Sequence, residues 1–344
     1  MSVASSVRSQ IERMCADLSA DPLLVQGAGG NVSWKDDDTL WIKASGTWLS
    51  DAQVDDIFIP TDLAHIRGAL DQRDFTINPK VTSRSNLKPS IETLLHALMP
   101  QRIVIHLHAI DVLAHLVRND CELEFQSLLP KNMNYAFVKY CKPGEDLAKN
   151  VFEAIQGDPN INMVFLLNHG LVLAGETVLE VMKLLDNLLG YVREGIFVKS
   201  VVQVTFDDKN TFEKLLRHGY IPSKLARFHD LALDPRLSHF VESKWALFPD
   251  HVVFLGAEPF IGCCDTLDDM LERNESSPPS FIFCKGVGTF QHTGVTRAQI
   301  DQLTCYYDVA VRQSDPEKIV DLSKEDIAAL LDWEAEKYRV GLSK

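Results

Sequence analysis

The chain has 344 residues, of which 46% are hydrophobic and 24% are charged, so it is expected to be globular and to form two domains. Its formal net charge of −14 argues against nucleic acid as a partner, because the phosphates would be repelled. No apolar run reaches the roughly 18 residues needed to cross a bilayer, and the N-terminus does not resemble a signal peptide. Seven irregularly spaced cysteines are expected to be reduced thiols, which predicts a cytoplasmic protein.

The first sixty residues predict one helix and two strands. Apolar residues at helical spacing indicate a helix over about residues 5–19. A glycine-rich turn at 27–30 then leads into a strand near Val32, and a second strand at 39–44 ends at Ser45 and Gly46. A dinucleotide-binding glycine loop is followed by a helix, with an acidic residue about twenty positions further on. Because both flanks of this turn look extended, we reject a dinucleotide-binding interpretation.

Two histidines occupy alternate positions of the apolar run 103–109, which is predicted to be a buried strand. His106 and His108 would then point to the same face of a sheet. Glu92 is expected in the first turn of the preceding helix, at 91–98, and His169 follows a second apolar strand at 162–167. Three imidazoles suit a divalent transition metal with one position left open, although a single buried histidine is more often a hydrogen-bonded core residue.

Downstream of His169 the pattern predicts a continued strand at 171–174 and a long helix from Val178 to about Val198. The composition then changes at a polar break, which predicts domains over 1–205 and 206–344. The second domain is expected to contain strands at 250–256 and 280–284 and a helix at 296–312. Its segment 281–296 is weakly similar in sequence to segment 165–177. This similarity reflects either a repeated unit or the general likeness of any two strand–helix units.

Five segments resemble, in order and approximate spacing, the class II aldolase/adducin family: 29–33, 43–46, 89–92, 106–108 and 168–170. The resemblance covers about residues 8–200. Segments 248–256 and 333–337 add a more specific likeness to the aldolase portion of bifunctional rhamnulose-phosphate aldolase/dehydrogenase proteins, without their dehydrogenase domain or a nicotinamide cofactor. The implied fold is α/β, an αβα sandwich around a central, mainly antiparallel sheet, followed by a smaller C-terminal α/β domain.

The resemblance also implies roles for individual residues. The metal ligands would be His106, His108 and His169, holding zinc or another divalent transition metal, and Glu92 would be the catalytic acid/base. The two turns match the substrate and phosphate cradle of the family, with the candidates Gly30, Asn31, Ser45, Gly46 and Ser90. Ile91 stands where phosphate-binding aldolases carry a second serine, which leaves phosphate recognition open, and Lys43 either adds positive charge there or faces solvent.

The implied function is that of a metal-dependent aldolase, a lyase that cleaves or forms a C–C bond in a ketose or ketose phosphate through a metal-stabilised enediolate. A sugar-phosphate epimerase, dehydratase or decarboxylase is the alternative, because these reactions use the same metal site. A non-catalytic adducin-like scaffold is disfavoured because all three histidines and Glu92 are present. The expected partners are a small sugar or sugar phosphate and further copies of the chain, in a homo-oligomer such as the tetramers of the family.

Overall fold

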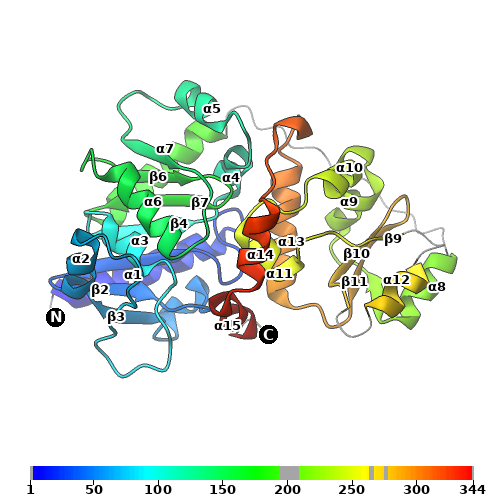
Figure 1. Ribbon diagram of the computed structural model, residues 1–344, viewed down its shortest axis with the longest axis horizontal. Coiled ribbons are helices and arrows are strands. Elements are labelled where there is room, and N and C mark those ends of the chain that lie inside the picture. The colour runs from blue at the N-terminus through cyan, green and yellow to red at the C-terminus, as the bar shows by residue number, and fades with distance from the viewer. Residues whose placement is uncertain (1–2, 194–208, 263–266, 275–277, 343–344) are drawn as a thin grey trace.

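The computed structural model describes residues 3–193, 209–262, 267–274 and 278–342 (Figure 1). The first half of the chain contains, in order, α1 (Val3–Ala20), β1 (Asn31–Asp36), β2 (Thr39–Lys43), η1 (Leu49–Gln53), β3 (Phe58–Asp62), α2 (Leu63–Asp71), α3 (Thr93–Leu98), β4 (Ile103–Leu107), α4 (Ile110–Leu116), α5 (Cys121–Leu128), β5 (Tyr135–Val138), α6 (Glu145–Ile155), β6 (Met163–Leu166), β7 (Gly170–Gly175) and α7 (Val178–Val192). The second half contains α8 (Lys209–Arg217), β8 (Tyr220–Pro222), η2 (Ala226–His229), α9 (Asp230–Leu233), α10 (Pro235–Ser243), α11 (Pro249–Leu255), β9 (Ile261–Gly262), α12 (Leu267–Arg273), β10 (Phe281–Cys284), β11 (Gly288–His292), α13 (Arg297–Ala310), η3 (Pro316–Lys318), α14 (Lys324–Leu331) and α15 (Glu334–Leu342).

Strands β1 to β7 form a central sheet in the spatial order β3-β2-β1-β4-β7-β6-β5. All neighbouring pairs are antiparallel except β5 and β6. The central strand β4 lies between β1 and β7, and the register pairs Asn31 with His106 and Leu107 with Leu171. Because antiparallel neighbours run in opposite directions, the start of β1, the end of β4 and the start of β7 lie at the same end of these three central strands.

Helices cover both faces of this sheet, which confirms the predicted αβα sandwich. Side chains along β4 alternate between the faces. Ile103 and Ile105 pack with residues of α1, α4 and α7, whereas Val104 packs with residues of α3 and α6. His106 has the same parity as Val104 and therefore points to the face that carries α3.

A second, smaller sheet in the C-terminal part has the order β8-β11-β10-β9, as the expectation of a smaller α/β unit requires. Figure 1 shows α11, α13 and α14 between the two sheets. The largest hydrophobic cluster joins residues of α4, such as Leu113, to residues of α13, such as Tyr306. The C-terminal segment therefore shares a core with the central sheet. The proposed domain boundary at 205/206 lies outside the described residues.

Most of the predicted elements are confirmed. The N-terminal helix is α1, and the glycine turn leads into strand β1 rather than into a helix. The predicted helix at 296–312 is α13, where Thr296 and Gln299 form a capping box. The cysteines at positions 15, 121, 141 and 305 are free thiols. None of the described helices is both long and apolar enough to span a membrane.

Three predictions about local structure were wrong or need adjustment. Residues 250–256 are not a strand, because α11 begins at Pro249 and ends before Gly256, whose φ is +91°. A short apolar run does not distinguish a strand from a buried helix, which explains the error. Residues 171–174 do not continue β6, since β7 folds back antiparallel on it. Glu92 occupies the N-cap position of α3 rather than its first turn, and its side chain makes no capping hydrogen bond. The predicted helix end near residue 198 lies outside the described residues.

Candidate metal centre and active site

The three predicted metal ligands meet where the start of β1, the end of β4 and the start of β7 lie side by side. His106 lies in β4, His108 follows the end of that strand, and His169 immediately precedes β7. All three are buried, and their candidate ligand atoms lie within 4.8 Å of one another. The Nε2 atoms of His106 and His108 are 3.2 Å apart. Sequence periodicity thus correctly placed two imidazoles together, and the hairpin of β6 and β7 brings the third to them.

The donor set fits a divalent transition metal such as zinc. Zinc binds imidazole nitrogen at about 2.0–2.1 Å, so two ligands at a tetrahedral angle stand about 3.3–3.4 Å apart, close to the 3.2 Å between the two Nε2 atoms. Nδ1 of His106 lies 3.2 Å from the carbonyl oxygen of Leu171. A proton on Nδ1 would be donated to that carbonyl, which leaves the Nε2 lone pair directed at the other imidazoles.

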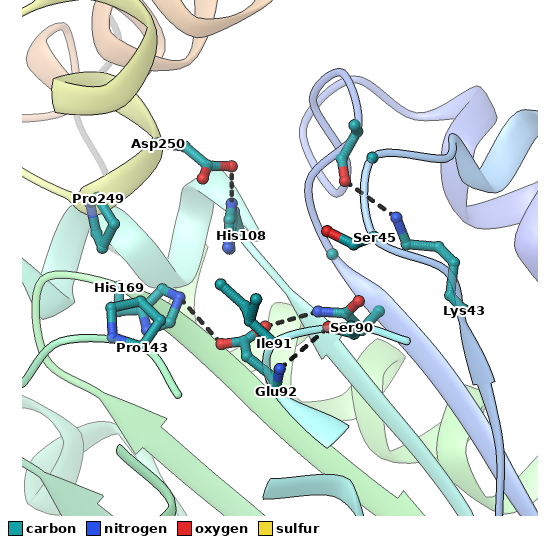
Figure 2. Close-up of a pocket in the computed structure, with 14 residues that line it drawn as sticks. Lys43, Ser45, Ser90, Ile91, Glu92, His108, Pro143, His169, Pro249 and Asp250 are labelled. Carbon is teal, nitrogen blue, oxygen red and sulfur yellow. Dashed lines mark hydrogen bonds and ion pairs between the residues drawn. The ribbon is translucent and has the colours of Figure 1, made fainter. Parts of the chain in front are cut away.

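Glu92 lies beside this group and is only 5% exposed. Its Oε1 is 3.4 Å from Nε2 of His169, and its Oε2 is 3.6 Å from Nε2 of His106. The side-chain amide of Asn31 donates to Oε2 at 2.6 Å, and the Glu92 backbone N–H donates to Oγ of Ser90 at 3.2 Å. Figure 2 shows the carboxylate directed at His169 from the segment that precedes α3. These contacts orient a carboxylate next to the imidazoles.

A pocket lies at this centre, with about 400 Å³ of space not filled by atoms, part of which is open solvent (Figure 2). All five residues that the family resemblance assigned to the cradle line it, together with Glu92 and two of the three histidines. The lining residues are Ala28, Gly30, Asn31, Lys43, Ser45, Gly46, Ser90, Ile91, Glu92, His108, Pro143, His169, Pro249 and Asp250. His106 reaches the site through its contacts with His108 and Glu92.

The residues of the predicted cradle combine a lysine, hydroxyl groups and tight glycine turns. Lys43 does not face solvent, because it is buried and its Nζ donates to the carbonyl oxygens of Ala28 at 3.0 Å and Thr47 at 2.6 Å. Gly30 has a φ of +71°, and a Cβ there would lie 3.0 Å from the backbone oxygen of His106. Glycine is therefore required at position 30, where β1 passes β4. Ile91 adds an apolar surface to the pocket, as do Ala28, Pro143 and Pro249.

Sequence reasoning missed the contribution of the C-terminal segment. Pro249 and Asp250, at the start of α11, line the pocket, and Asp250 Oδ2 lies 3.6 Å from Nδ1 of His108. The signal that would have found them is proline followed by an acidic residue, which is typical of a first helical turn. His96, which the sequence does not assign to the metal ligands, has its Nδ1 2.7 Å from Oγ of Ser33. Burial lowers the pKa of His96 well below its ordinary value.

Comparison with known proteins gives a family match. The profile described as Class II Aldolase and Adducin N-terminal domain matches residues 10–190. The "Uncharacterized oxidoreductase YuxG" of Bacillus subtilis is 28% identical over 176 residues, which are 46% of this chain and 25% of that protein. The "Probable methylthioribulose-1-phosphate dehydratase" of Trichoplax adhaerens is 24% identical over 187 residues, which are 49% of this chain and 76% of that protein. The chain thus spans a quarter of the first relative's length and about three quarters of the second's.

Comparison with solved structures also finds chains that resemble part of this one. The N-terminal class II aldolase domain of a conserved protein from Thermoplasma acidophilum has 24% identity and a TM-score of 0.46, and the match covers 54% of this chain and 91% of that one. The L-fuculose-1-phosphate aldolase from Thermus thermophilus has 18% identity and a TM-score of 0.39, and the match covers 55% and 92% of the two chains.

Proposed function

Because the chain belongs to the class II aldolase and adducin N-terminal domain family, we propose that it is a metal-dependent lyase. The proposed reaction is reversible aldol cleavage of a C–C bond in a ketose or ketose phosphate, which gives an aldehyde and a dihydroxyacetone-type fragment. The observation that carries the proposal is the meeting of three buried imidazoles and the carboxylate of Glu92 at one pocket. The family contains both aldolases and dehydratases, so the type of bond broken is part of the proposal.

His106, His108 and His169 would hold zinc or another divalent transition metal. The cation would supply Lewis-acid stabilisation of the negative charge that develops on substrate oxygens. The chain's own contribution begins with Glu92, which would remove or return the proton on the carbon beside the substrate carbonyl. Asn31 holds its Oε2. Among the described residues, the buried Oε1 has no hydrogen-bond partner, so Oε1 is the atom that would take the proton.

The other end of the pocket would bind an anionic or hydroxylated part of the substrate. Lys43 supplies positive charge close to the hydroxyl groups of Ser45 and Ser90, and the backbone turns at Gly30 and Gly46 leave room for a ligand to approach. With Ile91 in place of a further hydroxyl group, fewer donors are available for a phosphate. We also propose that the chain forms a homo-oligomer, as the family resemblance implies.

The dehydratase-type relative supports a second candidate, elimination of water from a sugar phosphate at the same site. Incubation of the metal-loaded protein with a panel of ketoses, with and without phosphate, in deuterated water distinguishes the two. We expect aldehyde release and incorporation of deuterium beside the carbonyl of the ketone fragment. Loss of water without aldehyde would replace aldol cleavage by dehydration, and a change of configuration alone would indicate epimerisation.

The panel also tests what the cradle recognises. If Lys43 and the two serines bind phosphate despite Ile91, phosphorylated ketoses will be turned over with the lower KM. Equal KM values for a ketose and its phosphate would show that the cradle holds a sugar hydroxyl group instead. Absence of any turnover and of proton exchange across the panel, with metal bound, would contradict the proposed lyase function.

A further inference from the structure

The two nitrogens of the His108 ring face different groups. Nε2 lies 3.2 Å from Nε2 of His106, and Nδ1 lies 3.6 Å from Oδ2 of Asp250 (Figure 2). The side chains of His108 and Asp250 are 9% and 3% exposed. Asp250 therefore stands on the side of the ring away from the other imidazoles, at the nitrogen that does not point to the centre.

A carboxylate at that nitrogen has a defined effect on a metal ligand. A neutral imidazole carries one N–H, and an acceptor at Nδ1 favours the tautomer with its lone pair on Nε2. Metal-binding histidines commonly donate the remaining N–H to a carboxylate or carbonyl oxygen, which fixes the ring and raises its basicity. The Leu171 carbonyl can take this role for His106. A movement of about half an ångström would bring Asp250 within hydrogen-bond distance of His108.

The backbone leaves room for this contact. Gly29 passes beside the pair, and a Cβ there would lie 3.2 Å from Nδ1 of His108 and 3.3 Å from Oδ2 of Asp250. Any larger residue at position 29 would press against both atoms and against the backbone oxygen of Gln26, 2.9 Å away. Glycine at this position thus permits the direct approach of the carboxylate to the imidazole.

Further contacts join the C-terminal segment, residues 209–342, to the chain close to His108 and His169. Arg312 pairs with Asp111, three residues beyond His108, at 2.9 Å, and the two side chains are 9% and 5% exposed. The side-chain amide of Asn168, next to His169, donates to the backbone oxygens of Leu247 at 2.9 Å and Val320 at 2.7 Å. The segment that carries Asp250 is therefore held in place on both sides of the histidine group.

We propose that Asp250 is a positioning residue of the metal centre, and that the segment following the family-matched residues 10–190 thereby completes the site. This inference rests on the proposed metal-binding function of the three histidines. Asp250 acts through His108: it holds the Nδ1–H tautomer and directs Nε2 at the cation. A residue of this kind changes metal affinity rather than the identity of the ligands.

The test compares zinc affinity of the full-length protein, measured by chelator competition, in wild type, Asp250→Asn and His108→Ala. We expect Asp250→Asn to weaken zinc binding by about 10- to 100-fold, since loss of such a partner has effects of that size. In the His108→Ala background the same substitution should have no further effect. Equal affinity of Asp250→Asn and wild type, or an equal loss in both backgrounds, would overturn the inference. Failure of wild-type protein to bind zinc would instead contradict the proposed function.

Asp230→Asn is the matched control, because Asp230 is a buried carboxylate of the same segment that accepts a hydrogen bond from Tyr307 at 2.9 Å, away from the pocket. Its zinc affinity should equal that of wild type. If Asp250→Asn does not fold, the tautomer of His108 in zinc-loaded wild-type protein decides the matter. Nitrogen-15 NMR should show a slowly exchanging proton on Nδ1 of His108. Coordination through Nδ1, or rapid exchange of that proton, would overturn the inference.

Discussion

At the scale of single residues, the site depends on how each polar group is oriented. Asn31 was predicted to belong to a phosphate cradle, and it does line the pocket. Its side-chain amide is nevertheless engaged with Glu92, at 2.6 Å. In the proposed mechanism Asn31 therefore fixes one carboxylate oxygen, and anion binding is left to Lys43, Ser45 and Ser90.

Replacing Glu92 by glutamine tests the proposed proton transfer. The variant keeps the size of the side chain and the three histidines, so metal content should be unchanged. Deuterium exchange at the carbon beside the substrate carbonyl, measured by proton NMR, should fall by about 10²- to 10⁴-fold, because a positioned acid/base contributes that much. Glu124→Gln, which alters a carboxylate paired with His115, should leave exchange unaffected. Wild-type exchange in Glu92→Gln would exclude the assigned role.

At the scale of elements, the close approach of β4 and β7 creates the histidine group. Gly170 begins β7, and a Cβ there would lie 2.6 Å from the backbone oxygen of Leu107 and 3.1 Å from ring carbons of both His106 and His108. A side chain at position 170 would therefore separate two ligands and distort the strand pairing.

Gly170→Ala and Gly190→Ala form a matched pair that tests this role of the hairpin. Gly170→Ala should both destabilise the fold and weaken metal binding, because a carbonyl oxygen 2.6 Å away leaves no room for a methyl group. Gly190 lies in α7, and a methyl group added there would meet no atom within 4 Å. Gly190→Ala should stabilise the protein by up to about 1 kcal/mol. Urea unfolding and zinc titration of both variants measure these effects; wild-type metal affinity in Gly170→Ala would contradict the account.

The same elements show what the sequence could and could not predict. Alternation along β4 predicted that His106 and His108 share a face, because strand period is a local property. The pairing of Asn31 with His106 is not local, since register depends on how distant strands meet. The position of His169 after a second apolar strand singled it out as a third imidazole, and the family resemblance implied the roles of His169 and Glu92. The likeness over 248–256 included Asp250 but implied no role for it, and the apolar run that follows was mistaken for a strand.

The weak sequence similarity between segments 165–177 and 281–296 corresponds to a shared order of elements. β6, β7 and α7 form a hairpin followed by a helix, and β10, β11 and α13 do the same. Each helix is capped by a threonine, Thr177 and Thr296, whose hydroxyl group accepts a backbone N–H. Lys285, which stands in the second unit where His169 stands in the first, pairs with Glu242 at the surface.

At the scale of the whole molecule, the central sheet and the C-terminal segment are held together by a common apolar core. Within it, His251 of α11 packs against the rings of Trp245, Phe248 and Tyr306. Neither ring nitrogen has a hydrogen-bond partner among the described residues. Burial lowers the pKa of His251 to about 3.

The lowered pKa of His251 predicts how the free energy of unfolding depends on pH. The unfolded chain protonates His251 below about pH 6.5, whereas the folded chain stays neutral there, so its contribution to stability is complete above that pH. It is lost as the pH falls from 6.5 toward 3, by up to about 1.4 kcal/mol per unit. His251→Phe should lose about 2 kcal/mol less than wild type between pH 7 and 5 in urea unfolding. If the two proteins lose equal stability between pH 7 and 5, His251 takes up its proton in the folded protein over the same pH range as in the unfolded chain.

Metal content tests the central claim most directly. After dialysis, elemental analysis of full-length wild-type protein should find about one zinc or similar divalent ion per chain, as three imidazole ligands require. His106→Ala and His169→Ala, checked for folding by circular dichroism, should each lose that ion. Equal metal content in wild type and both variants would contradict the account.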